Sequence, residues 1–409
     1  MTDLDLPWGG WDAATRDDPW ALFASVRAAS PVCPVRLADG HDAWLVAGHD
    51  AARRALNDPA LSKDMLAALA GDPDVVAEGL PGPAFARHML AVDPPDHTRL
   101  RRLVARAFVP SRVAALEPAI SALAAGLLDD LAAAGAGGAP VDLVAGFALP
   151  LPYRVISEML GVPEPARTEL YGAFRTLLAP WAGDPPPEAL VASATIVGHL
   201  EALVDAKRDA PGDDLVSVLV AASDDGDRLT RRELLSSVFQ LYVAGHDTTT
   251  SLIGNGVVAL LAHPDQLAGL VADPAGWPAA VEELVRYDAP VPHATFRVTT
   301  RPVDVGGVEI PAGRQVLVCL AAANRDPDHH PTPDALDVAR APQPHLGFGH
   351  GIHFCLGAPL ARLQARIAFA ALFGRFPGLR LAVPRRALAW SHGDGLVLRG
   401  LDALPVVLG

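Results

Sequence analysis

The sequence predicts a mainly α-helical fold with small antiparallel β-sheets, and three observations support this prediction. Half of the 409 residues are hydrophobic, and the alanine-rich stretches lack runs of β-branched residues, as is typical of helices. Apolar residues recur three and four positions apart over 110–131 and 189–206, the spacing of amphipathic helices. After Pro290, short strand-like segments alternate with glycine and proline turns.

The longest predicted helix begins at Thr230 and ends near Ala262. Thr230 and Glu233 have the T-x-x-E spacing of a capping box, in which each side chain accepts a hydrogen bond from the other residue's backbone. About 30 residues at ~1.5 Å each would span roughly 45 Å, enough to cross a whole domain. The middle of this helix, residues 244–250, is polar and contains a glycine where apolar packing is expected. This anomaly indicates a functional site.

The segments 296–305, 308–310 and 315–320 predict a small antiparallel sheet with glycine-containing turns between them. An irregular, proline-rich segment follows over 325–344, and then a glycine-rich loop and a final helix. No fixed-period repeat or long linker divides the chain, so we expect a single domain over residues 1–409.

Charge and cysteine content exclude several classes of function. The chain has 33 basic and 47 acidic residues, which argues against nucleic acid as a partner, because phosphate binding requires a basic surface. Residues 1–15 lack a basic segment followed by an apolar stretch, so we expect neither a signal peptide nor a membrane anchor, and a cytoplasmic protein. The three cysteines, Cys33, Cys319 and Cys355, are too few and scattered for a disulfide framework. One of them is available for chemistry.

Cys355 lies where the glycine-rich loop 347–357 meets the start of a helix. Exposed N–H groups and the helix dipole stabilise a thiolate there, and glycines let the backbone approach a large planar ligand closely. These are the properties required of a thiolate ligand to heme iron. The alternatives are a buried structural cysteine, or zinc bound with His345, His350 and His353, although this spacing lacks the paired motifs usual for zinc.

The loop resembles the heme-binding signature of the cytochrome P-450 family, F-x-x-G-x-H/R-x-C-x-G. Every defined position is matched, by Phe348, Gly351, His353, Cys355 and Gly357. The resemblance implies the cytochrome P-450 fold, with a long central helix crossing the heme. It also implies heme b (iron protoporphyrin IX) bound through Cys355, with Phe348 and Gly357 beside the cofactor and His353 at a propionate.

The polar centre of the long helix resembles the family's oxygen-activating motif A-G-x-D/E-T, matched by Ala244, Gly245, Asp247 and Thr248. Bound O2 must receive protons before its O–O bond breaks, which requires an alcohol at the oxygen and a carboxylate that relays protons from solvent. Thr248 would be the alcohol and Asp247 the relay. Alone, Thr248 could instead bond its own i−4 carbonyl, whereas a buried Asp247 implies a partner or a water-filled kink, as expected if Gly245 opens the helix.

Glu283 and Arg286 form an E-x-x-R pair, whose i,i+3 side chains can make an ion pair. Such a pair is usually a surface salt bridge, but its position resembles the structural pair of the family. The family often adds an arginine from the irregular segment, where this chain has Ala335 and Leu336. We therefore expect Arg340 to be the third partner.

The segment 93–101 resembles the start of the family's proximal helix, where His97 and Arg101 would bind a heme propionate. Arg297, at the start of the predicted sheet, is the other propionate candidate. Arginine and imidazole donors suit carboxylates, although a solvated surface position is the usual place for any single arginine.

The chain has no G-x-G-x-x-G motif in a βαβ unit, so electrons from NAD(P)H are expected through separate redox proteins, a ferredoxin with its ferredoxin reductase. An acidic ferredoxin could dock on a basic helix face, or that face could be an ordinary solvated surface. The residues of this face are Arg99, Arg102 and Arg106.

The resemblance implies that one atom of O2 is inserted into a medium-sized apolar compound, such as a polyketide, terpenoid or macrolide intermediate. His293 is a candidate polar anchor that could equally face solvent. Alternatives are phenol coupling, desaturation or peroxide-driven oxidation and, from another class, a non-catalytic heme or zinc protein. The expected substrate contacts are Leu241, Ala244, Gly245, Val291, Pro292, His293, Ala294, Leu396 and Val397.

Overall fold

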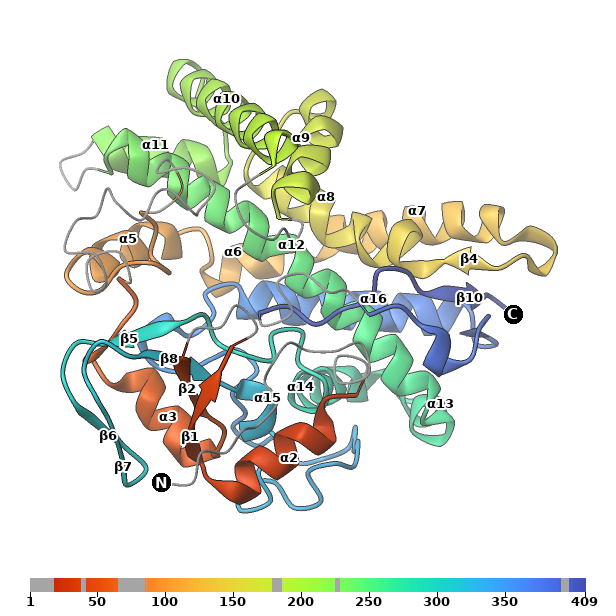
Figure 1. Ribbon diagram of the computed structural model, residues 1–409. Coiled ribbons are helices and arrows are strands. Elements are labelled where there is room, and N and C mark those ends of the chain that lie inside the picture. Colours follow the sequence, from red (N-terminus) through yellow and green to blue (C-terminus); the bar gives the residue numbers. More distant parts are fainter. Residues whose placement is uncertain are drawn as a thin grey trace. The chain divides into compact units, whose positions relative to one another are not determined.

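The chain divides into two compact units. Figure 1 labels their helices and strands. The computed structural model describes residues 18–37, 42–64, 85, 87–178, 186–224, 229–390 and 397–409. The first unit comprises the chain up to Leu61, 113–151 and 248–409; the second comprises 62–112 and 152–247. Helix α12 (Arg231–Leu261) passes from the second unit to the first. A single functional domain over 1–409 stays a prediction.

The first unit combines helices with nearly all of the strands. The helices are α2 (Trp20–Ala29), α3 (His49–Asn57), α7 (Glu117–Ala134), α13 (Pro264–Ala272), α14 (Trp277–Tyr287), α15 (Leu320–Ala323) and α16 (Ala358–Arg375). Shorter helical turns cover Ala136–Gly138, Val144–Ala148, Pro274–Gly276, Gly351–His353 and Arg385–Ala387. A three-stranded sheet has the order β4 (Val141–Asp142), β10 (Pro405–Val407), β9 (Arg380–Leu381).

A five-stranded sheet has the order β1 (Val32–Arg36), β2 (Asp42–Val46), β8 (Gln315–Val318), β5 (Arg297–Thr299), β3 (Leu61–Ser62). Strands β5 and β8 pair antiparallel, as predicted, and β6 (Val303–Val305) and β7 (Val308–Ile310) form a hairpin. However, β8 also pairs in parallel with β2, so this sheet is mixed. The predicted strand over 315–320 ends at Val318, because α15 begins at Leu320.

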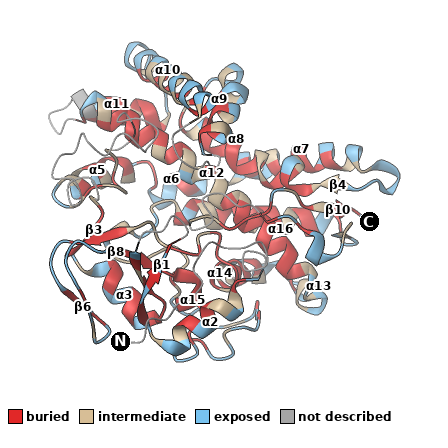
Figure 2. Ribbon diagram, viewed as in Figure 1, coloured by how far each residue is buried: buried red, intermediate tan, exposed pale blue. Residues whose placement is uncertain are grey.

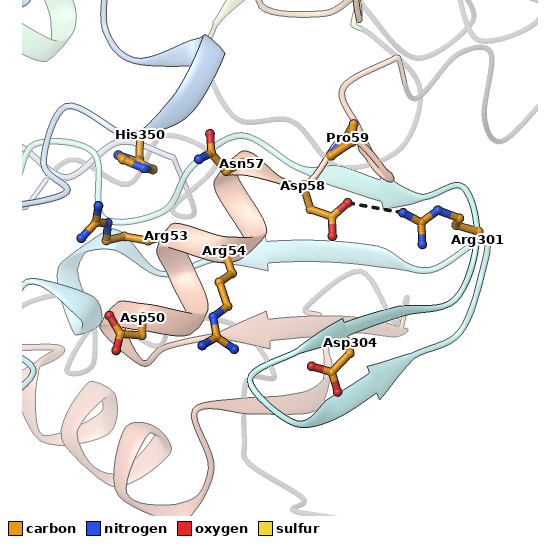
Figure 3. Close-up of a pocket in the computed structure, with 9 residues that line it drawn as sticks. All are labelled: Asp50, Arg53, Arg54, Asn57, Asp58, Pro59, Arg301, Asp304 and His350. Atoms are coloured by element: carbon orange, nitrogen blue, oxygen red, sulfur yellow. Dashed lines mark ion pairs between the residues drawn. The ribbon is translucent and has the colours of Figure 1, made fainter.

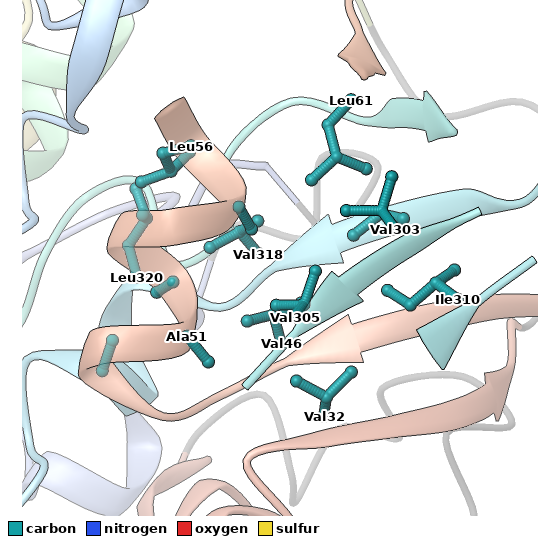
Figure 4. Packing of buried hydrophobic residues seen from close by; sticks show 14 of the residues in the cluster. Val32, Val46, Ala51, Leu56, Leu61, Val303, Val305, Ile310, Val318 and Leu320 are labelled. Carbon is teal, nitrogen blue, oxygen red and sulfur yellow. The ribbon is translucent and has the colours of Figure 1, made fainter. Parts of the chain in front are cut away.

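The central strands of this sheet are buried on both faces. Val46 and Val318 pack with residues of α3 in one cluster (Figure 4). Leu45 and Leu317 pack with Phe23 of α2 in another. Because successive side chains point to opposite faces, β2 and β8 contain continuous apolar runs without the alternation of a half-buried strand.

The second unit is helical. It comprises α5 (Asp96–Ala105), α8 (Pro150–Met159), α9 (Glu164–Leu177), α10 (Pro187–Asp209), α11 (Leu215–Asp224) and the first half of α12. Buried and exposed residues alternate along α10 (Figure 2), which contains the helix predicted over 189–206. By length and composition α10 could also cross a membrane, although core helices of other proteins meet the same criterion.

The helix predicted over 110–131 is interrupted. Helix α6 (Pro110–Ala115) ends before Leu116, and α7 begins at Glu117. Pro118 has no N–H to donate to the preceding turn, and its ring disfavours a continuous helix at this point. The apolar spacing continues across the break and therefore does not reveal it.

Helix α12 begins with the predicted capping box. The Thr230 N–H donates to Glu233 Oε2 at 2.8 Å, and the Glu233 N–H donates to Thr230 Oγ1 at 3.2 Å. The helix then continues through Gly245, where a side-chain Cβ would lie 2.7 Å from Ile156 of α8. The glycine therefore permits close helix packing, and the expectation that it opens the helix is wrong.

A buried ion network joins α14 to the irregular segment 325–344. Glu283 accepts two hydrogen bonds of 2.7 Å from Arg286 and one of 3.2 Å from Arg340 Nε. Burial raises the pKa of the Glu283 carboxyl, but hydrogen bonds from Arg286 and the Asp337 N–H, together with the charge of Arg340, lower the pKa below its usual value overall. Arg286 also donates to the backbone carbonyls of Asn324, Pro333 and Ala335.

We predict that Glu283→Gln lowers the free energy of unfolding by about 3–5 kcal/mol, because it leaves the buried Arg286 guanidinium uncompensated. The matched control is Glu117→Gln, whose exposed carboxylate pairs with Arg366 at 2.7 Å and should contribute at most about 1 kcal/mol. Denaturant unfolding of both variants is the measurement. Equal destabilisation of the two would contradict the structural role of the network.

Candidate active site

The Cys355 loop is held in a compact turn against α3. The Cys355 N–H donates to the Phe348 carbonyl at 2.9 Å, and the Gly349 N–H donates to Leu346 at 2.8 Å. Gly351 has φ +75°, and a Cβ there would lie 2.6 Å from Asn57 Oδ1. Only glycine meets both conditions, so it is required for the loop to lie directly on α3.

The thiol of Cys355 is exposed, three residues before α16 begins. The apolar side chains of Ile352 and Phe354 are also exposed, at 48% and 38%. A Cβ at Gly357 would meet no atom within 4 Å. A soft sulfur donor, exposed apolar side chains and an open glycine together fit a planar apolar ligand that carries a metal.

The other two cysteines are unsuited to this role. Cys33 and Cys319 are buried in the cluster between the five-stranded sheet and α2. Burial raises the pKa of the Cys33 thiol to about 11 and that of Cys319 to about 12, so both stay protonated near neutral pH. Cys355 is therefore the accessible thiol of the chain.

Glu282 supports the loop from behind, a role that the sequence analysis missed. Its carboxylate accepts from Arg362 Nε at 2.6 Å and contacts His345 Nε2 at 3.1 Å. Burial raises the pKa of Glu282, but these two partners outweigh burial and lower it to about 2. The Arg362 guanidinium lies 4.4 Å from the centre of the Phe348 ring, so the network fixes a residue of the heme signature. In the sequence, the only indication of this role was that Glu282 directly precedes Glu283 of the E-x-x-R pair.

The zinc alternative for this loop gains no support. In the part of the chain that the structure describes, the group of three ligand-type side chains close enough for a metal does not include Cys355. His345 is instead engaged by Glu282.

The centre of α12 presents Ala244 as an exposed residue and Asp247 and Thr248 as partly exposed residues. The prediction that Asp247 is buried is wrong, since 34% of its side chain is exposed. The helix itself turns the neighbouring His246 inward, where only 2% of the side chain is exposed. Asp247 has the expected partner, because its Oδ1 lies 3.2 Å from His246 Nε2.

A backbone contact fixes the orientation of the His246 ring. His246 Nδ1 lies 2.7 Å from the Tyr242 carbonyl, which can only accept, so Nδ1 carries a hydrogen. Nε2 is then the ring nitrogen that faces the Asp247 carboxylate.

Tyrosines surround His246. The rings of Tyr153 and Tyr242 pack edge-on against it at 5.6 and 5.8 Å, and the Tyr242 hydroxyl donates to the Tyr153 hydroxyl at 2.6 Å. Burial raises the pKa of both phenols, so they stay neutral. His246 therefore has an uncharged environment on this side.

The propionate candidates lie in different units. His97 is buried in α5, and Arg101 lies one turn later on the same helix. In the first unit, Arg297 begins β5 and donates to the Leu61 carbonyl at 3.3 Å, and His353 ends the helical turn before Cys355. Their joint binding of a cofactor stays a prediction.

Among the expected substrate contacts, His293 requires a correction. Its side chain has no exposed surface, its ring lies 5.6 Å from that of Phe23, and its backbone bridges to Cys319. It is a core histidine, so the solvent-facing alternative is wrong and the polar-anchor role has no support. Leu396 lies outside the described residues.

The remaining expected contacts differ in exposure. Leu241 and Pro292 are buried, Ala244 is exposed, and the others are intermediate: Gly245, Val291, Ala294 and Val397.

The expected basic face of α5 is smaller than predicted. Arg99 does not contribute to a basic face for a partner protein, because it forms hydrogen bonds with Asp96 at 3.0 Å and Glu233 at 3.4 Å. Arg102 is exposed on α5, and Arg106, which was expected on the same helix, is exposed directly after its last residue, Ala105.

Comparisons with known proteins extend these observations to the whole chain. The cytochrome P-450 family model matches residues 277–380. The cytochrome P-450 monooxygenase PikC of Streptomyces venezuelae is 48% identical over 405 residues, covering 98% of this chain and 94% of that protein. The 6-deoxyerythronolide B hydroxylase of Saccharopolyspora erythraea is 43% identical over 402 residues, covering 96% of each.

Solved structures that are similar to this chain are also cytochromes P-450. The tirandamycin C-bound monooxygenase TamI is similar with a TM-score of 0.87 and 41% identity, covering 97% of this chain and 99% of that one. PksS, the bacillaene polyketide synthase cytochrome P-450 of Bacillus subtilis 168, has a TM-score of 0.89 and 35% identity, covering 98% and 99%. Since the likeness spans nearly the whole length, with an exposed cysteine at the heme signature, the chain belongs to the cytochrome P-450 family.

Proposed function

We propose that this monooxygenase binds heme b through Cys355 and uses Asp247 and Thr248 to supply protons for insertion of one oxygen atom into a medium-sized apolar molecule. The observation that carries the proposal is the exposed Cys355 thiol at the start of α16, beside exposed Ile352 and Phe354. His97, Arg101, Arg297 and His353 would hold the propionates. We also propose that residues 1–409 act as a single catalytic domain.

The bound heme would supply the iron that activates O2, and the residues of α12 would control the protons. The Thr248 hydroxyl is suited to hold a hydrogen bond at the reacting oxygen. Asp247, about one-third exposed, can exchange protons with solvent and passes them on, while His246 positions its carboxylate.

The substrate class is proposed as a polyketide, terpenoid or macrolide intermediate of secondary metabolism. The exposed Ala244 and the half-buried Val291 and Ala294 offer small or apolar contacts. Named activities of relatives include 6-deoxyerythronolide B hydroxylation and mycinamicin IV hydroxylation or epoxidation. A second candidate is bond formation without oxygen insertion, because one similar structure is named for C–S bond formation. The product mass separates the two.

Electrons are proposed to come from NAD(P)H through a ferredoxin and its reductase. Exposed Arg102 on α5 and exposed Arg106 directly after it offer a basic surface to an acidic partner. A cytoplasmic location is proposed because Cys33, Cys319 and Cys355, all within the described residues, form no disulfide, as is usual in a reducing compartment.

We predict that the reduced, carbon monoxide-bound protein has a strongly red-shifted Soret band that Cys355→Ala abolishes. The reason is electron donation from a thiolate to the iron. Absorption spectroscopy is the measurement, and Cys33→Ala, which removes a buried protonated thiol, should keep the band. An unchanged band in Cys355→Ala would refute the ligand assignment.

Thr248→Ala should lower product formation by roughly 10²-fold, since a proton donor at the oxygen is lost. The assay uses ¹⁸O2, a ferredoxin, its reductase and NADPH, and counts labelled product per NADPH consumed. Thr250→Ala is the matched control, because the Thr250 hydroxyl is buried without a hydrogen-bond partner. Equal yields from Thr248→Ala and wild type would exclude the proton-supply role, and an unlabelled product would favour the second candidate.

His246→Asn is expected to retain a donor for the Tyr242 carbonyl but to lose the contact with Asp247. It should lower the product per NADPH by about 10- to 100-fold and change the pH profile of turnover, with little change in melting temperature. His263→Asn is the control, because His263 contacts its own i−4 carbonyl at 2.8 Å in the same way. Unchanged coupling and pH profile in His246→Asn would refute the positioning role.

A further inference from the structure

A cluster of two histidines and one aspartate lies in the first unit, separate in sequence from every residue assigned above. One ring nitrogen each of His49 and His329 and one carboxylate oxygen of Asp50 all lie within 4.8 Å of one another. His49 and Asp50 begin α3, and His329 follows α15. The cluster therefore joins segments that are 280 positions apart in the chain.

The distances are close to those of a metal site. Asp50 Oδ1 lies 3.2 Å from His329 Nε2 and 3.7 Å from His49 Nδ1. Ligands of a tetrahedral Zn²⁺, at bond lengths of about 2.0–2.1 Å, are separated by about 3.4 Å. Two of the three separations thus need only small adjustments to accommodate an ion.

His49 is the ligand whose chemistry is otherwise unexplained. Only 3% of its side chain is exposed, and both ring nitrogens are buried without a hydrogen-bond partner. A buried imidazole without partners is costly, and a metal would satisfy it.

Hydrogen bonds from the backbone to Asp326 position the two histidines before any ion binds. Asp326 is the common anchor: its Oδ2 accepts from the His49 N–H at 2.9 Å, and its carbonyl accepts from the His329 N–H at 3.1 Å. The rings of His49 and His329 stack at 3.8 Å. His330 does not belong to the cluster of close ligand atoms, and its Nδ1 contacts Gln343 Oε1 at 3.1 Å.

Solvent reaches the cluster from the side of Asp50. Figure 3 shows Asp50 beside Arg53 and Arg54 in an open pocket of about 690 Å³ that also contains His350. The pocket contains three arginines and three aspartates, so it does not present an excess of positive charge to an approaching cation. The side chain of Asp50 is 71% exposed and that of His329 33% exposed.

We propose that His49, Asp50 and His329 bind a Zn²⁺ ion, with water as the fourth ligand. Two imidazoles and a carboxylate are a common zinc donor set, with an open position for water. The ion would fasten the start of α3 to the segment after α15. Because α3 also supports the Cys355 loop through Asn57, the site would stabilise the scaffold behind the heme ligand without touching the reacting atoms.

The test is Zn²⁺ titration calorimetry of the heme-loaded, tag-free protein, with zinc X-ray absorption to identify the ligands. We expect one saturable site per chain with two imidazole nitrogens and oxygen ligands. His329→Ala and Asp50→Asn should each weaken Zn²⁺ binding at least about 10-fold. Asp50→Asn keeps the shape of an exposed side chain, so it covers the case in which His329→Ala does not fold.

The matched control is His199→Ala. His199 and Glu169 form a pair at 2.9 Å with side-chain exposures of 27% and 66%, close to those of His329 and Asp50, but without a buried second histidine. This variant should bind Zn²⁺ as the wild type does. The proposal is overturned if the wild type has no saturable site, or if both site variants bind Zn²⁺ as tightly as His199→Ala.

Discussion

Direct contact between the Cys355 loop and α3 is the constraint on which the first unit's part of the active site depends. Gly351 has no room for a side chain, because a Cβ would lie 2.6 Å from Asn57. The loop is fixed on its other side by α14, where the consecutive carboxylates of Glu282 and Glu283 point to different partners. Glu282 stabilises the loop, and Glu283 stabilises the irregular segment that precedes it. Helix α14 therefore stabilises both the Cys355 loop and the irregular segment 325–344.

The centre of α12 places buried polar side chains directly beside a polar side chain that is exposed to solvent. Tyr242 and His246 are buried and hydrogen-bonded within their unit, whereas Asp247 remains open to solvent. Since a helix turns about 100° per residue, adjacent positions can serve a dry side and a wet side. The polar cluster is therefore compatible with a continuous helix, and Gly245 contributes by close packing against Ile156.

Local signals explain what the sequence predicted well. The capping box of α12 depends on residues three apart, and the heme signature on ten consecutive residues. Features that depend on distant residues were missed: β2 is buried on both faces and lacks alternation, and His293 is buried by Phe23, which is 270 positions away. The exposure of Asp247 was also mispredicted, because a motif does not specify which side of its helix is covered. His49 and His329, which are 280 positions apart, come together only in the folded chain, where Asp326 binds the backbone of both.

The contrast between the three cysteines has a practical consequence. Alkylating reagents attack thiolates, and the raised pKa of Cys33 and Cys319, together with their burial, keeps both of these thiols unreactive in the folded protein. Cys355 is exposed when its sulfur is not coordinated. The number of thiols labelled per folded molecule would then equal the fraction of chains without cofactor. Thiol labelling of the native sequence therefore measures heme occupancy without an engineered probe.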